Sequence, residues 1–286
     1  MIFCYATEFR QSTLHLLLQM RYFFHIGYRG TNYHGWQKNS KANSVQQVIE
    51  EKISQVLKMP TTINGCGRTD AQVNASQYFF HADIEADCDE TFLFRLNRIL
   101  PEDIAVFDII PMEGLPHARF DAVQRRYDYF IHTYKNPFLS TCSSQFLNLD
   151  LNFEKLKQAT SLLTRYNDYR PFCTSPDKNK HTICYVAEAN WLVKADGNQL
   201  RFQISANRFL SKMVRIIVGQ LLKVGTGKLS VDEFENYLIT KETPKILSPA
   251  PPRGLYLSKV TYPYLDLAPK TEFLGLNFGK DGWRII

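Results

Sequence analysis

The sequence predicts an α+β protein with two domains, in which helices cover one face of mainly antiparallel sheets. Segments with the period-two alternation of strands are separated by segments with helical spacing, in the order strand, helix, two strands, helix, strand. A similar order recurs in the second half, and 286 residues are enough for two medium-sized domains. We expect residues 1–19 to form an N-terminal extension, 20–112 the first α+β domain and 113–286 the second.

The elements of the first domain follow from its apolar periodicity and its helix-terminating residues. Ser44 and Gln47 form a capping-box pattern in front of apolar residues at helical spacing, and Pro60 follows that helix. Pro101 closes a second helix in the same way. The expected strands cover residues 21–28, 62–67, 73–84 and 104–110, and the expected helices cover residues 44–58 and 90–100.

The second domain shows the same kinds of signal. The pair Asp196-Gly197 predicts a turn between two strands, and Gly225 ends a strongly apolar helix. Ser230 and Glu233 form a capping-box pattern at the start of the last helix. The expected strands cover residues 125–134, 182–193, 200–205 and 255–262, and the expected helices cover residues 153–164, 209–224 and 230–239.

The composition excludes several classes of protein. Hydrophobic residues make up 44% of the chain, which argues against global disorder. The formal charge of +6 suits a polyanionic partner without requiring one. Six cysteines occur without a C-x-x-C pair, so we expect reduced thiols in a cytoplasmic protein rather than a zinc ribbon. The apolar stretch at 14–18 is too short to span a membrane, and no secretory signal or membrane contact is expected.

A short run in the first domain is the strongest candidate for chemistry. It reads Gly65-Cys66-Gly67-Arg68-Thr69-Asp70-Ala71. A carboxylate such as Asp70 can attack a sugar carbon or move a proton, and glycines beside it let a large substrate come close. On extended backbone Arg68 shares a face with Asp70 and can pair with it. A turn carboxylate in a structural ion pair is the competing interpretation.

Basic and aromatic residues cluster at the start of the second domain. Arg119, Arg125 and Arg126 lie within a few residues of Tyr127 and Tyr129. Arginines clamp phosphates and aromatic rings stack on unpaired bases, so the cluster suits a nucleic acid. The alternative is the exposed side of a sheet with cross-strand Tyr and Arg pairs.

Two further cations lie on the apolar helix expected at residues 209–224. Lys212 and Arg215 are three residues apart, among side chains that are otherwise apolar. A charge in such surroundings needs a partner. Either a buried carboxylate or a substrate phosphate would supply it.

Seven motifs follow one another between residues 22 and 263. They are the aromatic loop ending in Gly-Trp-Gln at 28–37, Gly-Arg-Thr-Asp-Ala at 67–71, Leu-Asn-x-x-Leu-Pro-x-Asp-Ile at 96–104, His-Ala-Arg-Phe with Arg-x-Tyr-x-Tyr at 117–129, Asp-Tyr-x-x-Phe at 168–172, Asn-x-Phe-Leu-x-x-Met-Val-Arg-x-Ile-Val-Gly at 207–219 and Ala-Pro-x-x-Gly-Leu-x-Leu at 250–257. In type and order they resemble the tRNA pseudouridine synthase A family, and the resemblance implies the pseudouridine synthase fold.

The resemblance also implies an activity and a set of site residues. Members of the family isomerise uridine to pseudouridine in the anticodon arm of tRNA, without cofactor or metal, as homodimers that bind one tRNA across both subunits. Asp70 takes the place of the catalytic aspartate, and Tyr127 that of the tyrosine that stacks on the target base. Arg68 takes the place of the arginine beside the aspartate, and Arg215 that of the helix arginine that pairs with it. The residues themselves leave open whether Asp70 attacks the sugar or accepts a proton.

The sequence departs from the family pattern at several positions near these motifs. Gln72 and Asn74 stand where the family has Gly and His, and Asp128 adds an acid to the strand expected to face RNA. If the glycine is needed for a positive φ, Gln72 is strained by about 1 kcal/mol. These departures favour, as alternatives, an RNA-binding pseudo-enzyme or a paralogue that acts on another RNA site. A metal-dependent hydrolase would need a second ligand, and none lies within ten residues of Asp70.

Overall fold

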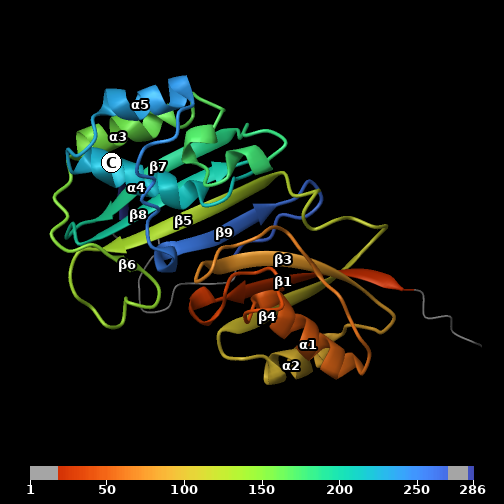
Figure 1. Cartoon of the computed structure of the whole chain (residues 1–286). Helices are drawn as coiled ribbons and strands as arrows, with labels where there is room; N and C mark the ends of the chain where they lie inside the picture. Colours follow the sequence, from red (N-terminus) through yellow and green to blue (C-terminus); the bar gives the residue numbers. More distant parts are fainter. Residues whose placement is uncertain (1–18, 270–282) are drawn as a thin grey trace, which may run out of the picture.

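The described strands join into one mixed sheet rather than two separate ones (Figure 1). A computed structural model describes residues 19–269 and 283–286, so all of the expected extension except Gln19 lies outside the described residues. The sheet has ten strands, in the order β10-β7-β8-β5-β9-β3-β1-β4, with β2 paired to β3 and β6 to β5. The strands are β1 (Met20–Tyr28), β2 (Asn64–Gly65), β3 (Asn74–Ile84), β4 (Ile104–Met112), β5 (Gln124–His132), β6 (Ser144–Gln145), β7 (Val186–Lys194), β8 (Gln199–Ala206), β9 (Leu255–Thr261) and β10 (Trp283–Ile285).

Two groups of helices cover the two ends of this sheet. Figure 1 shows α3, α4 and α5 over the strands β5, β7 and β8, and α1 and α2 over the strands β1, β3 and β4. Most strand pairs are antiparallel, while β3 pairs with β9 and β5 with β6 in parallel, so the mainly antiparallel α+β class is confirmed. The helices are α1 (Val45–Leu57), α2 (Glu90–Ile99), α3 (Phe153–Leu162), α4 (Met213–Gly225) and α5 (Val231–Thr240).

The hydrophobic core has two main clusters, one under each group of helices. The first is built mostly from β1, β3, α1 and α2, and the second from β5, β7, β8 and α3 to α5. Tyr127 on β5 packs against both clusters. The division into two domains at residue 112 stays a prediction, because the two halves share a sheet.

Strand β9 joins the two halves. It comes from the last part of the chain and lies between β5 and β3. Its parallel contact with β3 runs through the pairs Asn74–Tyr256 and Ala75–Leu257. This contact brings the start of β3, and the loop that carries Asp70 just before it, next to the second half of the molecule.

Several elements differ from their predicted bounds for local reasons. Helix α4 begins at Met213, later than predicted, because Lys212 in front of it has a left-handed backbone with φ 58°. Ser44 caps α1 by accepting from the backbone N–H of Gln47, while the Gln47 side chain donates to Glu51 instead of closing the box. The capping box of α5 is complete, as predicted. Strand β2 is reduced to Asn64–Gly65, so most of the segment before Asp70 is loop.

Candidate active site

A cleft of about 1180 Å³ lies where the two halves meet. The loop between β2 and β3 contributes Arg68 and Asp70, strand β5 contributes Tyr127, and the first turn of α4 contributes Arg215. All four predicted site residues therefore line one cavity, although they come from segments far apart in the chain. The charge of its lining is strongly biased, since Asp70 is the single acidic residue among the described lining residues. The cations that line the cleft are Arg68, Arg119, Arg125, Arg208, Lys212 and Arg215.

Asp70 and Arg215 form an ion pair in this cleft. Nη1 of Arg215 donates to Oδ2 of Asp70 at 3.1 Å. The Asp70 side chain remains 31% exposed, against 13% for Arg215, so the carboxylate is held from one side and open to the cleft on another. Of the two partners that the sequence left open for Arg215, the structure provides the carboxylate.

The segment that precedes β9 fixes Arg215 in turn. Nε of Arg215 donates to the carbonyl oxygen of Ala250 at 2.7 Å, and the N–H of Ala250 donates to the carbonyl of Arg215 at 2.9 Å. Gly219, one helical turn further along α4, allows this contact, because a Cβ there would lie 2.1 Å from the carbonyl oxygen of Ser248. The Ala250 carbonyl thus orients the guanidinium, and the backbone contact fixes Arg215 to the segment that carries this carbonyl.

Arg68 does not make the pair with Asp70 that its spacing suggested. Its Nε donates to Oε1 of Gln37 at 2.9 Å, and its side chain is exposed at the edge of the cleft. The argument from spacing assumed extended strand backbone, whereas residues 66–73 form a loop in which residues two apart need not share a face. Arg68 is consequently available to a ligand that enters the cleft.

The aromatic loop that follows β1 supports the Asp70 loop. The hydroxyl groups of Tyr28 and Thr69 are hydrogen-bonded at 2.9 Å, and the N–H of Gln72 donates to the carbonyl of Tyr33 at 3.1 Å. Gly35 has φ 89°, and a Cβ there would lie 2.3 Å from the carbonyl oxygen of Thr69. The sequence indicated this loop by its glycines and aromatic residues but not that it holds the carboxylate.

The two glycines in front of Asp70 have different roles. A Cβ on Gly65 would lie 2.1 Å from the hydroxyl of Tyr78 and 2.5 Å from Nε1 of Trp36, so this glycine is required for packing. Gly67 has no such neighbour within 4 Å among the surroundings described for it, and it lines the cleft. The close approach of a substrate that the sequence suggested for both glycines can therefore apply to Gly67 alone.

Gln72 and Asn74, the two residues near Asp70 that depart from the family pattern, have different roles in the structure. Gln72 has φ 63° and lines the cleft, so it combines the strained backbone and the narrowed cavity that the sequence offered as alternatives. Asn74 is fully buried, accepts from the N–H of Gly30 at 2.8 Å and donates to the carbonyl of Arg253 at 2.8 Å. Asn74 thus keeps hydrogen bonding as expected, but it ties two loops together behind the cleft.

Tyr127 presents its ring to the cleft from the centre of β5. The ring packs edge-to-face against Phe209, with centroids 5.0 Å apart. Burial raises the pKa of the Tyr127 phenol above its usual value, so the hydroxyl stays protonated at neutral pH. A neutral aromatic ring in this position suits stacking on a base.

Arg125 has a structural role instead of the phosphate contact suggested by its sequence neighbourhood. Its guanidinium donates to the carbonyl oxygens of four residues, which belong to three segments around the cleft. These are Ala122 at 2.7 Å, Asn207 at 3.1 Å, Cys66 at 3.0 Å and Arg119 at 2.7 Å. Arg125 therefore fastens the loop before Asp70 to the loop before β5, a role that spacing alone did not reveal.

Alternate residues of β5 point away from the cleft. Arg126 donates to Ser205 and lies 3.4 Å from Glu188, on the other side of the sheet. Asp128, the acid in the strand expected to face RNA, is 1% exposed and accepts from Nε of Arg201 at 2.6 Å. Because side chains along a strand alternate between faces, this acid lies on the face opposite to that of Tyr127.

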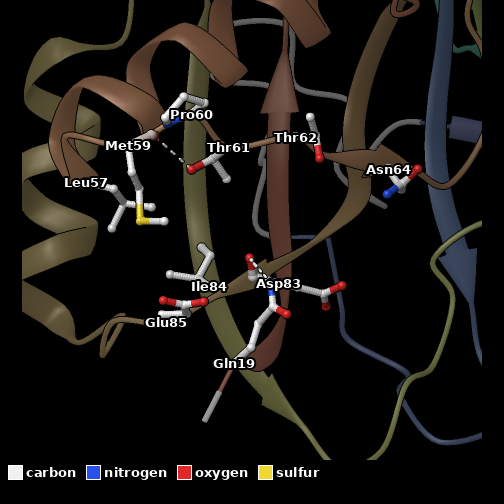
Figure 2. Close-up of a pocket in the computed structure, with 10 residues that line it drawn as sticks. All are labelled: Gln19, Leu57, Met59, Pro60, Thr61, Thr62, Asn64, Asp83, Ile84 and Glu85. Atoms are coloured by element: carbon white, nitrogen blue, oxygen red, sulfur yellow. Dashed lines mark hydrogen bonds between the residues drawn. The ribbon is translucent and has the colours of Figure 1, made fainter. Parts of the chain in front are cut away.

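A second cavity, of about 190 Å³, lies at the far end of the first half. Figure 2 shows Met59 and Pro60 on one side of it and Asp83 and Glu85 on the other. Asp83 already receives two hydrogen bonds of 2.7 Å from Arg21, which lowers the pKa of its carboxyl. The Asp83 carboxylate is thus paired within the fold.

Three further properties concern the described residues only. The five described cysteines are free thiols. Within residues 19–269 and 283–286, no three His, Cys, Asp or Glu side chains are grouped so as to hold a metal ion. In the same part of the chain, every helix is too short or too polar to cross a membrane.

The fold and the cleft thus define a class: an α+β protein in which a loop carboxylate, paired with a helix arginine, opens into a cation-lined cleft across a shared sheet. A family model described as tRNA pseudouridine synthase matches residues 163–263. The chain is 40% identical to tRNA pseudouridine synthase A of Porphyromonas gingivalis over 85% of this chain and 97% of that protein. The corresponding protein of Parabacteroides distasonis is 41% identical over 85% and 96%. The chain belongs to the tRNA pseudouridine synthase A family.

A solved structure shows a weaker likeness. The archaeal box H/ACA sRNP Nop10-Cbf5 complex aligns with 68% of this chain and 45% of that chain, with a TM-score of 0.32 and 11% identity.

Proposed function

We propose that this protein isomerises uridine to pseudouridine in the anticodon arm of tRNA, with Asp70 as the nucleophile. The observation that carries the proposal is the Asp70–Arg215 pair, whose carboxylate is 31% exposed in a cleft lined by six cations. A carboxylate that only stabilised the fold would not need to open into a cavity of about 1180 Å³. The membership of the family supplies tRNA as the substrate class.

The reaction makes specific demands on the cleft. The bond between N1 of uracil and C1′ of ribose breaks and a bond between C5 and C1′ forms. The hydrogen of C5 leaves as a proton and N1 takes up a proton, so the product is an isomer of the substrate. The base must leave its stack and turn while the cleft holds it. In our proposal Asp70 bonds to C1′ of the ribose as the bond to N1 breaks. The bond between Asp70 and C1′ breaks when C5 bonds to C1′, so no atom of the enzyme remains in the product.

The other cleft residues have supporting roles in this proposal. Arg215 orients the Asp70 carboxylate, Tyr127 stacks on the target base, and Arg68 contacts the RNA beside it. Six cations against the single carboxylate of Asp70 in the cleft lining favour a polyanion. The affinity for tRNA should therefore fall steeply with salt. We further propose a cytoplasmic homodimer that binds one tRNA across both subunits, which light scattering with and without tRNA would test.

The decisive experiment is tritium release from tRNA labelled at uridine C5, with the wild-type protein beside Asp70→Asn. Release by the wild type alone would support both the reaction and the role of Asp70. Release by both proteins would remove Asp70 from the chemistry. Failure of the wild type to release tritium from any tRNA that it binds would overturn the proposed activity and favour RNA binding without turnover.

A further inference from the structure

An exposed aromatic ring stands at the edge of the cleft, outside the set of residues considered so far. Phe120 is 74% exposed, and it lines the same cavity as Asp70 and Tyr127. A ring of this size normally gains stability by leaving water. Because Phe120 lies in the binding cavity, its exposure in the free protein points to a contact made with the ligand.

The turn that presents Phe120 is held firmly. The N–H of Arg119 donates to Nδ1 of His117 at 3.0 Å, and the N–H of His117 donates to Asp121 at 2.8 Å. Arg125 binds the carbonyl of Arg119 at 2.7 Å, which ties the same turn to the Asp70 loop. The backbone of such a turn has little freedom left to lose when a ligand contacts the ring that it carries.

The surroundings of Phe120 favour a nucleotide over an apolar protein surface. The His117 ring lies 4.2 Å from the Phe120 ring, at an interplanar angle of 36°, and the Arg119 guanidinium lies 5.7 Å from the Phe120 centroid. Arg119 itself is exposed, as is Lys212, which also lines the cleft. An aromatic ring beside one exposed cation, in a cleft that holds others, suits the bases and phosphates of single-stranded RNA.

We propose that Phe120 stacks on a nucleotide that flanks the target uridine. This inference rests on the proposed function. When the uridine leaves its stack, the base next to it loses a stacking partner, and Phe120 replaces that partner. Phe120 would thereby stabilise the opened RNA and set the position of the uridine relative to Asp70.

The first test compares three variants in binding to substrate tRNA, all made in the Asp70→Asn protein so that turnover does not interfere. Phe120→Ala should raise Kd by roughly 5- to 150-fold, the effect of about 1–3 kcal/mol of base stacking. Phe120→Trp should bind at least as well as the parent protein. Phe138→Ala is the matched control, because Phe138 is 86% exposed but lies outside the lining of the cleft. An unchanged Kd for Phe120→Ala would overturn the proposal.

The second test locates the contact with a double-mutant cycle on the RNA. RNAs with a single abasic site at each position flanking the target uridine are bound to the parent and Phe120→Ala proteins. We expect the loss of RNA affinity caused by Phe120→Ala to disappear when one particular flanking position is abasic and to persist when any other flanking position is abasic. An equal loss of affinity on every RNA would overturn the proposal. Dissociation of a homodimer by Phe120→Ala would also overturn it, because the ring would then belong to a contact between subunits. Tritium release by the wild type from the same tRNA is measured alongside, so failure of the proposed activity is recognised separately.

Discussion

Two aspartate–arginine pairs differ in what surrounds them: Asp128–Arg201 joins β5 to β8, and Asp70–Arg215 joins the loop before β3 to α4. Asp128 has a side-chain exposure of 1% and accepts from both Arg201, at 2.6 Å, and Gln203, at 2.9 Å. Asp70 is 31% exposed and accepts from Arg215 at 3.1 Å. Both are Asp–Arg pairs between distant segments, so residue type alone does not distinguish them.

The difference shows what makes a carboxylate available for chemistry. A carboxylate that is buried under several donors gives up its hydration to the fold, and breaking its pair costs stability. A carboxylate with one donor and an open side can still approach a substrate atom. The comparison predicts that loss of Asp70 harms turnover and spares stability, while loss of Asp128 does the reverse.

The largest expected effect is that of Asp70→Asn on catalysis. We expect turnover to fall by at least about 1000-fold, because an amide cannot replace a carboxylate nucleophile. Affinity for tRNA should stay within a few-fold, since the cations that line the cleft remain. Single-turnover rates and filter-binding constants measure the two effects, and the thermal midpoint should stay near that of the wild type.

Arg215→Lys should have the next largest effect. Arg215 uses two nitrogens of a rigid guanidinium, Nη1 for Asp70 and Nε for the Ala250 carbonyl. Lysine keeps the charge but has one nitrogen on a flexible chain, so the carboxylate loses its fixed orientation. We expect the single-turnover rate to fall by about 100-fold, the size of effect that small misplacements produce. Arg201→Lys is the matched control in the other pair. A rate loss in that variant would contradict the separation of the two pairs.

Asp128→Asn should affect stability instead of turnover. Breaking a fully buried ion pair costs about 3–5 kcal/mol, and we expect about 2 kcal/mol here because Arg201 is 21% exposed. The free energy of unfolding from urea titration measures the change. The rate per folded molecule, measured well below the melting range, should match that of the wild type, and a large drop would place Asp128 in the catalytic machinery.

The smallest expected effect is that of Gln72→Gly on stability, at a position two residues after Asp70. Relief of the left-handed backbone at φ 63° should raise the free energy of unfolding by about 1 kcal/mol. Gln72→Ala removes the side-chain atoms beyond Cβ but keeps Cβ and with it the strained backbone, so it should bring no such gain. If both variants change stability equally, the side chain and not the backbone is responsible.

Much of the local structure could be predicted from the sequence. The apolar spacing placed the five helices and most strands, because helix and strand periods depend on neighbours within a few residues. The capping box at Ser230 was predicted correctly for the same reason. The four candidate residues of the cleft, Arg68, Asp70, Tyr127 and Arg215, also stood out by type and motif. Their roles in catalysis and binding remain predictions.

The assembly of the site depends on contacts over long separations in the chain. Asp70 and Arg215 are 145 positions apart, and no spacing rule indicated that Arg215, and not the neighbouring Arg68, would take the carboxylate. The insertion of β9 between β3 and β5, and the four carbonyl contacts of Arg125, were equally absent from the sequence patterns. Local periodicity determines which face of an element is apolar, but only tertiary packing decides which elements meet. In this protein the Asp70 carboxylate acquires its partner Arg215 through that packing.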